Sequence, residues 1–113
     1  MEIKWENINN IHIARIKGRL DITSSAKFQE QVLAELSANP GSLIFDLTDV
    51  TYLSSSGVGV FLTVNRRLQV LQHAMCLCGI TSTVYKVLEL VDVIQHLQIF
   101  KDEQEAIAFL QKK

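Results

Sequence analysis

The sequence predicts an α/β domain with a mixed, mainly parallel sheet of about five strands and about four helices. Apolar segments with strand and helix spacing follow one another in the order β-β-α-β-α-β-α-β-α. Strands that are separated by helices require crossover connections, which make neighbouring strands parallel. The first two strands are joined by a tight turn and add an antiparallel edge. At 113 residues the chain is long enough for one domain, which we place over residues 1–113.

Composition narrows the class of protein. The chain is 48% hydrophobic and 20% charged, as in ordinary soluble domains. Its formal net charge of −1 argues against a general nucleic-acid binder, because such proteins usually show a basic excess. No apolar run approaches the roughly 20 residues of a membrane span, and the N-terminus does not resemble a signal peptide. We therefore expect a cytoplasmic protein, in which Cys76 and Cys78 are reduced thiols on one face of a strand.

The first third of the chain predicts a hairpin followed by a helix. Residues 2–18 alternate as two strands around Asn9 and Asn10, which suit a tight turn. His12 lies between two apolar residues of the second strand, and we expect it at the surface. The helix that follows is capped by Thr23, Ser24 or Ser25 and ends before the chain's single proline. Its inward side is predicted from four-residue spacing to consist of Phe28, Val32 and Leu36.

The middle of the chain predicts a strand, a turn and a second helix. An apolar run over 43–47 forms the strand, a turn region follows, and residues 50–53 lead to three serines and a glycine. A helical period then begins. Its buried stripe is predicted to contain Val60, Phe61, Val64, Leu68 and Leu71.

The last third predicts two more strand–helix units. Residues 75–79 form a strand, and the segment 81–83 caps a short helix. A final strand covers residues 97–100. Asp102 and Glu105 have the spacing of a capping box at the start of the last helix. The inward residues of the short helix are predicted to be Val84, Val87 and Leu88.

The strand–helix junction at residues 54–57 is the clearest candidate site. The first turn of a helix has unpaired N–H groups, which a serine caps or which an anion such as phosphate accepts. Both interpretations fit the three serines. Because ligands of open α/β sheets bind beyond the carboxyl ends of the strands, we expect Asp21 and Thr81 to cluster there with the serines. Asp46 and Asp49 are not accompanied by a phosphate-binding loop and are interpreted as turn and cap carboxylates.

Two motifs resemble one family. The segment Gly18-Arg19-Leu20-Asp21 is similar to the Gly-x-Leu-Asp segment of the STAS domain found in bacterial anti-sigma factor antagonists. Residues 45–47 and 53–59, ending in Ser54-Ser55-Ser56-Gly57-Val58-Gly59, resemble that family's strand and its Asp-Ser-Ser-Gly-Leu-Gly junction. The resemblance covers nearly the whole chain.

The resemblance implies a regulatory binding protein without catalytic residues or cofactors of its own. In the family, the serine that corresponds to Ser55 accepts a phosphate. The unphosphorylated antagonist binds an anti-sigma factor that is also a serine kinase, and this binding releases a sigma factor. The kinase, with ATP and magnesium, phosphorylates the serine, and a serine phosphatase reverses the modification. We expect the protein to be a monomer. The implied partner-binding residues are Asp21, Ser54, Ser55, Ser56, Gly57, Val58 and Leu62.

One departure from the family pattern leaves three alternatives. The residue before the acceptor is usually aspartate, and here it is Ser54. Ser55 is the acceptor, or Ser54 takes its place, or neither serine is modified. In the last case the chain serves as a STAS subunit of a stress-signalling scaffold or of a lipid-transport ATPase complex. An enzyme is not expected, because no histidine adjoins a serine and no Gly-x-Ser-x-Gly elbow is present.

Overall fold

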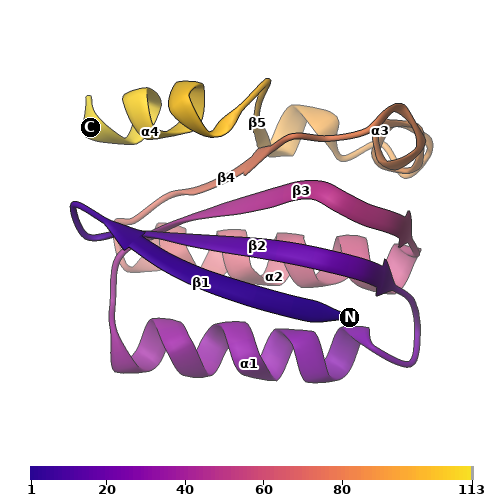
Figure 1. Ribbon diagram of the computed structural model, residues 1–113, viewed down its shortest axis with the longest axis horizontal. Coiled ribbons are helices and arrows are strands. Elements are labelled where there is room, and N and C mark those ends of the chain that lie inside the picture. The colour runs from indigo at the N-terminus through magenta and orange to yellow at the C-terminus, as the bar shows by residue number, and fades with distance from the viewer. Residues whose placement is uncertain (113) are drawn as a thin grey trace.

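Five strands form one mixed sheet in a computed structural model that describes residues 1–112 (Figure 1). The predicted fold class and element order are confirmed. The expected domain extends to Lys113, which lies outside the described residues. The strands are β1 (Glu2–Ile8), β2 (Ile11–Leu20), β3 (Ser42–Leu53), β4 (Met75–Cys78) and β5 (Gln98–Phe100). The helices are α1 (Ser25–Ala38), α2 (Ser55–Val70), α3 (Ser82–Leu90) and α4 (Glu103–Gln111), with a 3-10 turn η1 (Ile94–His96).

The strands lie side by side in sequence order, β1-β2-β3-β4-β5. Strands β1 and β2 are antiparallel, and every other pair is parallel. The predicted tight turn is present: Asn9 and Asn10 have φ angles of 52° and 66°, which asparagine tolerates better than most residues. The parallel arrangement brings the carboxyl ends of β2 and β3 to one edge, where α1 and α2 begin.

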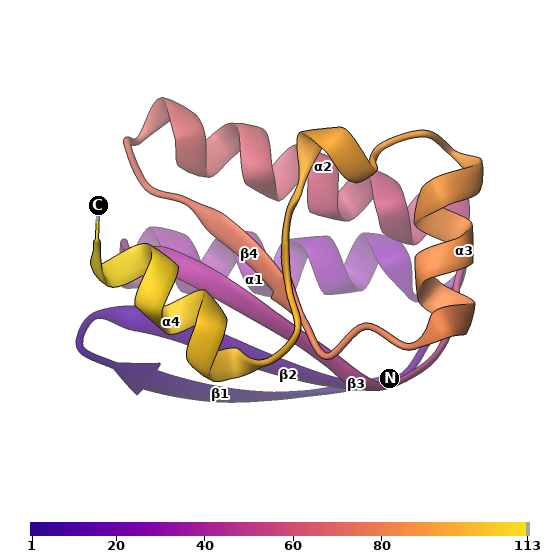
Figure 2. The same ribbon diagram turned by 90° about the horizontal axis from the view of Figure 1, so that it is seen from above.

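Helices cover both faces of the sheet. Helices α1 and α2 lie on one face and α4 on the other, while α3 lies near the carboxyl end of β3 (Figures 1 and 2). The larger core lies under α1 and α2. At its centre Phe28, Phe45 and Phe61 pack with ring centroids 5.1–6.2 Å apart, in the range of favourable aromatic pairs. The predicted inward positions Val32 and Leu36 of α1 are also buried.

The second core lies between the sheet and α4 and contains both cysteines. Cys76 and Cys78 form no disulfide and are both buried. They lie on the same face of the sheet, as predicted. Burial, with the Asp46 carboxylate nearby, raises the pKa of the Cys78 thiol to about 12. This thiol therefore stays protonated at neutral pH and is a poor nucleophile. Among residues 1–112, no helix is both long and apolar enough to cross a membrane.

The caps of α3 and α4 agree with the prediction. Thr81 is the N-cap of α3, and its hydroxyl accepts a hydrogen bond from the Val84 N–H at 3.3 Å. Asp102 caps α4 by accepting from the Glu105 N–H at 3.0 Å. The Glu105 carboxylate accepts a hydrogen bond from the Lys101 N–H at 2.9 Å. In a capping box the donor is the N–H of the N-cap residue, so here the bond is displaced by one residue.

Three sequence predictions about the elements and the core are wrong. No turn interrupts residues 43–53, because β3 is one strand of 12 residues. Leu71 is 52% exposed, because α2 ends at Val70 and the apolar stripe continues past the helix. His12 is 4% exposed rather than at the surface. Its Nε2 bonds the backbone carbonyl of Asn39 at the end of α1, and its ring meets Trp5 edge-on.

Candidate functional site at the start of helix α2

The junction between β3 and α2 is held by Ser54. This residue is the N-cap of α2, with extended backbone angles, and its hydroxyl accepts a hydrogen bond from the Gly57 N–H at 3.2 Å. Its own N–H donates to the carbonyl of Leu20 at 2.9 Å, which fastens the start of α2 to the end of β2. Ser54 therefore has a structural role through both its side chain and its backbone.

Ser55 differs from Ser54 in exposure and in bonding. It is the first residue of α2, it is exposed, and its hydroxyl has no hydrogen-bond partner among residues 1–112. The first turn of α2 contains no acidic side chain. The N–H groups and the dipole at this helix start favour a negative charge. The Ser55 hydroxyl is therefore free for chemistry, and its surroundings favour an anion.

Gly57, Val58 and Leu62 follow Ser55 along α2 and differ in how far they are buried. A Cβ on Gly57 would lie 2.6 Å from Leu53 Cδ1 and 3.1 Å from Leu20 Cβ, so a larger residue would require the Leu53 side chain to move and Leu20 to shift slightly. Val58, expected in the partner-binding set, is 3% exposed and lies in the core. Its side chain is turned away from solvent by the helical phase, so it offers no contact surface. Leu62 is half-buried against the same core.

Ser56 lines a shallow groove of about 420 Å³ between the starts of α1 and α2. Ile22 lines the same groove and is 78% exposed. Ile22 was not among the residues predicted for this site. An isoleucine directly after Asp21, in a loop without apolar periodicity, was the available signal for an exposed apolar contact.

Asp21 organises the loop between β2 and α1. Its Oδ1 accepts from the Thr23 hydroxyl at 2.7 Å, from the Thr23 N–H at 3.0 Å and from the Ser24 N–H at 3.1 Å. Hydrogen bonds to the Asp21 carboxylate lower its pKa to about 2. The bond from the Thr23 side chain contributes most, and the bond from the Ser24 backbone comes next. Ser24 occupies the N-cap position of α1 without a side-chain cap bond. Asp21 is thus a charged carboxylate that shapes this loop.

Arg19 and Tyr52 lie next to Asp21 at the carboxyl ends of β2 and β3. Arg19 Nε lies 3.7 Å from Asp21 Oδ2, and the Arg19 guanidinium stacks over the Tyr52 ring at 4.3 Å from its centroid. Arg19 and Tyr52 pair across β2 and β3, and the next pair is Leu20 with Leu53. Asp21 and Ser54 directly follow that pair, so the predicted proximity of Asp21 and the serines is confirmed.

Two other predicted polar positions lie apart from this cluster. Thr81 lines a different groove with Lys17, Gly18 and residues 48–51. Asp46 accepts from the Thr48 hydroxyl at 2.6 Å and from the Thr48 N–H at 3.0 Å, within β3 rather than in a turn. In the described part of the chain, no group of three or more His, Cys, Asp or Glu side chains is placed to hold a metal ion.

Known proteins share this architecture. The family model described as the STAS domain matches residues 2–106. The chain belongs to the STAS domain family. The anti-sigma-B factor antagonist of Listeria monocytogenes is 27% identical over 105 residues, covering 93% of this chain and 91% of the relative. This relative, which is similar in length, is thus named as an anti-sigma factor antagonist.

Solved structures show the same STAS fold. The anti-sigma factor antagonist SpoIIAA in its unphosphorylated form superposes with a TM-score of 0.82 at 20% identity, covering 99% of this chain and 98% of that one. The Bacillus cell fate determinant SpoIIAA in its phosphorylated form gives a TM-score of 0.71 at 20% identity, with coverages of 95% and 97%. At this identity the likeness concerns the fold.

Proposed function

We propose that this STAS protein is an anti-sigma factor antagonist controlled by phosphorylation of Ser55. In the unphosphorylated form it binds an anti-sigma factor that is also a serine kinase, and a sigma factor is released. Phosphorylation of Ser55 by that kinase ends the binding, and a serine phosphatase restores it. A partner that uses ATP implies that this exchange takes place in the cytoplasm. The observation that carries the proposal is the exposed, unbonded hydroxyl of Ser55 at the first helical position.

The position of Ser55 supports a switch that acts on the surface rather than on the fold. A phosphate adds about −1.5 to −2 charges and three strong hydrogen-bond acceptors. At the start of α2 these charges meet the positive end of the helix dipole, so the fold tolerates them. In an interface the same group brings repulsion and a desolvation cost, and each loss of about 1.4 kcal/mol lowers affinity about tenfold.

The structure gives a physical account of Ser54 in place of the family's aspartate. Serine and aspartate are equally good N-caps, and the Ser54 hydroxyl makes the cap bond to Gly57. The substitution therefore retains the cap and removes one negative charge beside Ser55. Because Ser54 is half-buried and engaged in the cap, Ser55 is the better acceptor of the two.

The proposed partner surface surrounds Ser55. Asp21 borders it from the β2–α1 loop, and Ile22 adds exposed apolar area. Leu62 extends it two turns along α2. Gly57 and Val58 lie beneath this surface and support it. Its side chains are those of Asp21, Ile22, Ser54, Ser55, Ser56 and Leu62.

A role in binding rather than catalysis agrees with the surroundings of the serines. Among residues 1–112, no hydrogen bond joins a histidine to any of the residues 54–56. His12 bonds Asn39 at the other end of the sheet, and the carbonyl of His96 accepts from Asn65. A serine nucleophile needs a base within hydrogen-bond reach, and the described residues provide none for Ser55.

Three variants test the switch on binding to the anti-sigma factor kinase of the host. Ser55→Ala removes the acceptor and is expected to retain binding. Ser55→Asp adds a permanent negative charge and is expected to lose at least about tenfold in affinity. Ser82→Asp is a matched control, because Ser82 is the exposed first residue of α3 and also follows an N-cap. It is expected to bind like the wild type.

Equal affinity of the wild type and Ser55→Asp would contradict the switch. A chain that never carries phosphate and stays in a fixed assembly would instead be a subunit of a signalling scaffold or a lipid-transport ATPase complex.

A further inference from the structure

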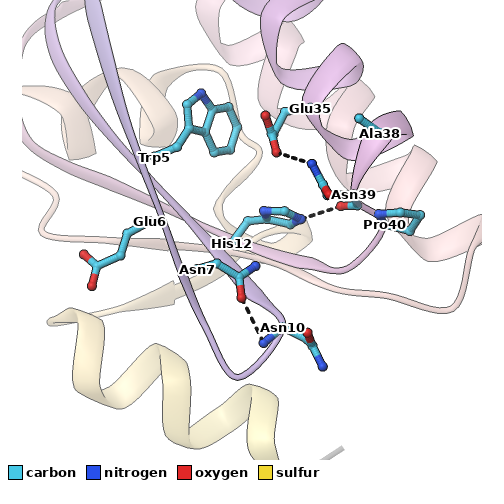
Figure 3. Close-up of a pocket in the computed structure, with 9 residues that line it drawn as sticks. All are labelled: Trp5, Glu6, Asn7, Asn10, His12, Glu35, Ala38, Asn39 and Pro40. Atoms are coloured by element: carbon cyan, nitrogen blue, oxygen red, sulfur yellow. Dashed lines mark hydrogen bonds between the residues drawn. The ribbon is translucent and has the colours of Figure 1, made fainter.

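A second hollow lies at the opposite end of the strands from Ser55. It has a volume of about 560 Å³ and lies between the β1–β2 hairpin and the end of α1 (Figure 3). Leu20 lies eight positions after His12 along β2, which corresponds to roughly 26 Å of strand. This volume falls in the range of about 300–1,000 Å³ of small-molecule sites. Nothing in the proposed switch uses this hollow.

The residues that line the hollow include an aromatic ring and hydrogen-bond acceptors. Trp5 stands on one side and Glu35 on the other, with His12 between them (Figure 3). The Glu35 Oε2 atom accepts from Asn39 Nδ2 at 2.8 Å, which holds the carboxylate in place and leaves its second oxygen available. Within the described part of the chain, no lysine or arginine lines the hollow.

His12 is a further polar side chain that lines the hollow. Its Nε2 must donate to the Asn39 carbonyl, because a carbonyl oxygen only accepts. In the neutral ring the other nitrogen, Nδ1, then carries a lone pair. The ring is 4% exposed and meets Trp5 at an interplanar angle of 86°, so its orientation is fixed.

The other carboxylate that lines the hollow is already neutralised. Glu6 points to the far side of β1 (Figure 3), where its Oε1 pairs with Arg15 Nη1 at 2.7 Å. The charge that faces the hollow without a cation is therefore that of Glu35. Among residues 1–112, Glu35 makes no ion pair.

The backbone around the hollow is preformed. A Cβ on Gly41 would lie 2.7 Å from the carbonyl oxygen of Asn10, so the hairpin turn packs directly against the chain that follows α1. The side chain of Asn7 accepts from the Asn10 N–H at 3.2 Å and closes the turn. A ligand would meet a shaped site and would not have to order a loop.

We propose that this hollow binds an organic cation, an alkylammonium or guanidinium group, between the Trp5 ring and the Glu35 carboxylate. Tryptophan is the best aromatic partner for a cation. A carboxylate forms strong charge-assisted hydrogen bonds with such groups. The cation comes either from a free small amine or from a lysine or arginine side chain of a protein.

Trp5 is the only tryptophan of the chain, so its fluorescence reports on the hollow directly. We would titrate the full chain with agmatine and, separately, with a capped Gly-Arg-Gly peptide. Sodium chloride at matched ionic strength and glutarate are the controls. The proposal predicts a saturable change with at least one of the two cations and none with the controls. Tighter binding of agmatine indicates a free amine, and tighter binding of the peptide indicates a side chain.

Two variants on α1 separate this site from general charge effects. Glu35→Gln keeps an oxygen that can accept from Asn39 and is expected to weaken binding about tenfold or more. Glu30→Gln removes the same charge from an exposed position outside the hollow and is expected to bind like the wild type. Trp5→Leu, followed by calorimetry, is also expected to lose affinity. The absence of any saturable response, or an unchanged affinity in Glu35→Gln, would overturn the proposal.

Discussion

At the scale of single residues, neighbouring serines have different tasks. The Ser54 hydroxyl caps α2, whereas the Ser55 hydroxyl has no partner in the described part of the chain. The local sequence could not separate these tasks, because either serine can cap a helix. The point at which α2 begins determines which serine caps it. The helix begins at Ser55, so Ser54 is the N-cap residue that precedes it.

Stability measurements distinguish the two serines. Ser54→Ala loses the cap bond and is expected to lower the free energy of unfolding by about 1 kcal/mol. Ser54→Asp restores the cap and is expected to recover most of that loss. Ser55→Ala removes no hydrogen bond and is expected to stay within about 0.5 kcal/mol of the wild type. Urea denaturation of the three variants checks this assignment, which fails if Ser55→Ala is the more destabilised.

Asp21 predicts a pH dependence of stability. Its pKa is lowered to about 2 in the folded protein, below the value of about 3.9 of an unfolded chain. A lowered pKa stabilises the fold above about pH 4, and this contribution is lost as the pH falls from about 4 towards 2. Asp21→Asn is therefore expected to be less stable at neutral pH and to lose less stability over that interval.

Thr23→Ala removes the hydroxyl that contributes most to the shift. It is expected to give an intermediate pH profile when denaturation is repeated from about pH 7 to about pH 2. Identical profiles for the wild type and Asp21→Asn would show that the carboxylate does not stabilise this loop.

At the scale of elements, the start of α2 depends on a close approach to the strands. Gly57 is buried where a Cβ would lie 2.6 Å from Leu53 Cδ1 and 3.1 Å from Leu20 Cβ, so Leu53 would have to move. Gly59 lies two residues further along the helix, and a Cβ added there would meet no neighbouring element within 4 Å. The two glycines therefore form a matched pair within one helix.

Substitution of the two glycines by alanine is expected to change the stability of the fold in opposite directions. Gly57→Ala requires the buried Leu53 side chain or α2 to shift and is expected to cost about 1–3 kcal/mol of stability, as overpacked cores do. Gly59→Ala improves helix propensity without a clash and is expected to add about 0.5–1 kcal/mol. Thermal and urea unfolding measure both changes. Equal destabilisation by the two substitutions would contradict the close approach at Gly57.

Helices were more predictable from the sequence than β3 or His12. Four-residue spacing identified Phe28 and Val32, because a helix shows its buried face locally. The strand β3 was divided in error, since it extends beyond its pairing with β4 at Asp46 and exposes Thr48 and Asp49 to solvent. Exposed polar residues such as Thr48 and Asp49 are also typical of turns, so the sequence pattern predicted a turn there. His12 was misplaced because the Asn39 carbonyl that it bonds lies 27 residues away.

At the scale of the whole molecule, the two proposed sites share one core. The aromatic cluster of Phe28, Phe45 and Phe61 joins α1, α2 and the sheet. Trp5 packs against the same core from the edge strand, as does Leu62 near the serines. The fold class and the serine cluster could be predicted from motifs and element order. The hollow at the hairpin could not, because its residues come from two segments, 5–12 and 35–40, that are far apart in the sequence.

One shared core predicts one unfolding transition. The fluorescence of Trp5 and the helical circular dichroism signal are expected to give coincident midpoints in urea, as in two-state domains of this size. The hairpin end and the helices would then unfold together. A lower midpoint for Trp5 fluorescence would show instead that the hairpin end unfolds independently.

The most direct measurement is mass spectrometry of the protein isolated from its own host, with fragmentation across residues 42–66. We expect a single phosphate on Ser55 in one growth condition and its loss in another. A phosphate on Ser54 would contradict the assignment of the free hydroxyl as the acceptor. The absence of phosphate in every growth phase and stress would contradict the switch itself.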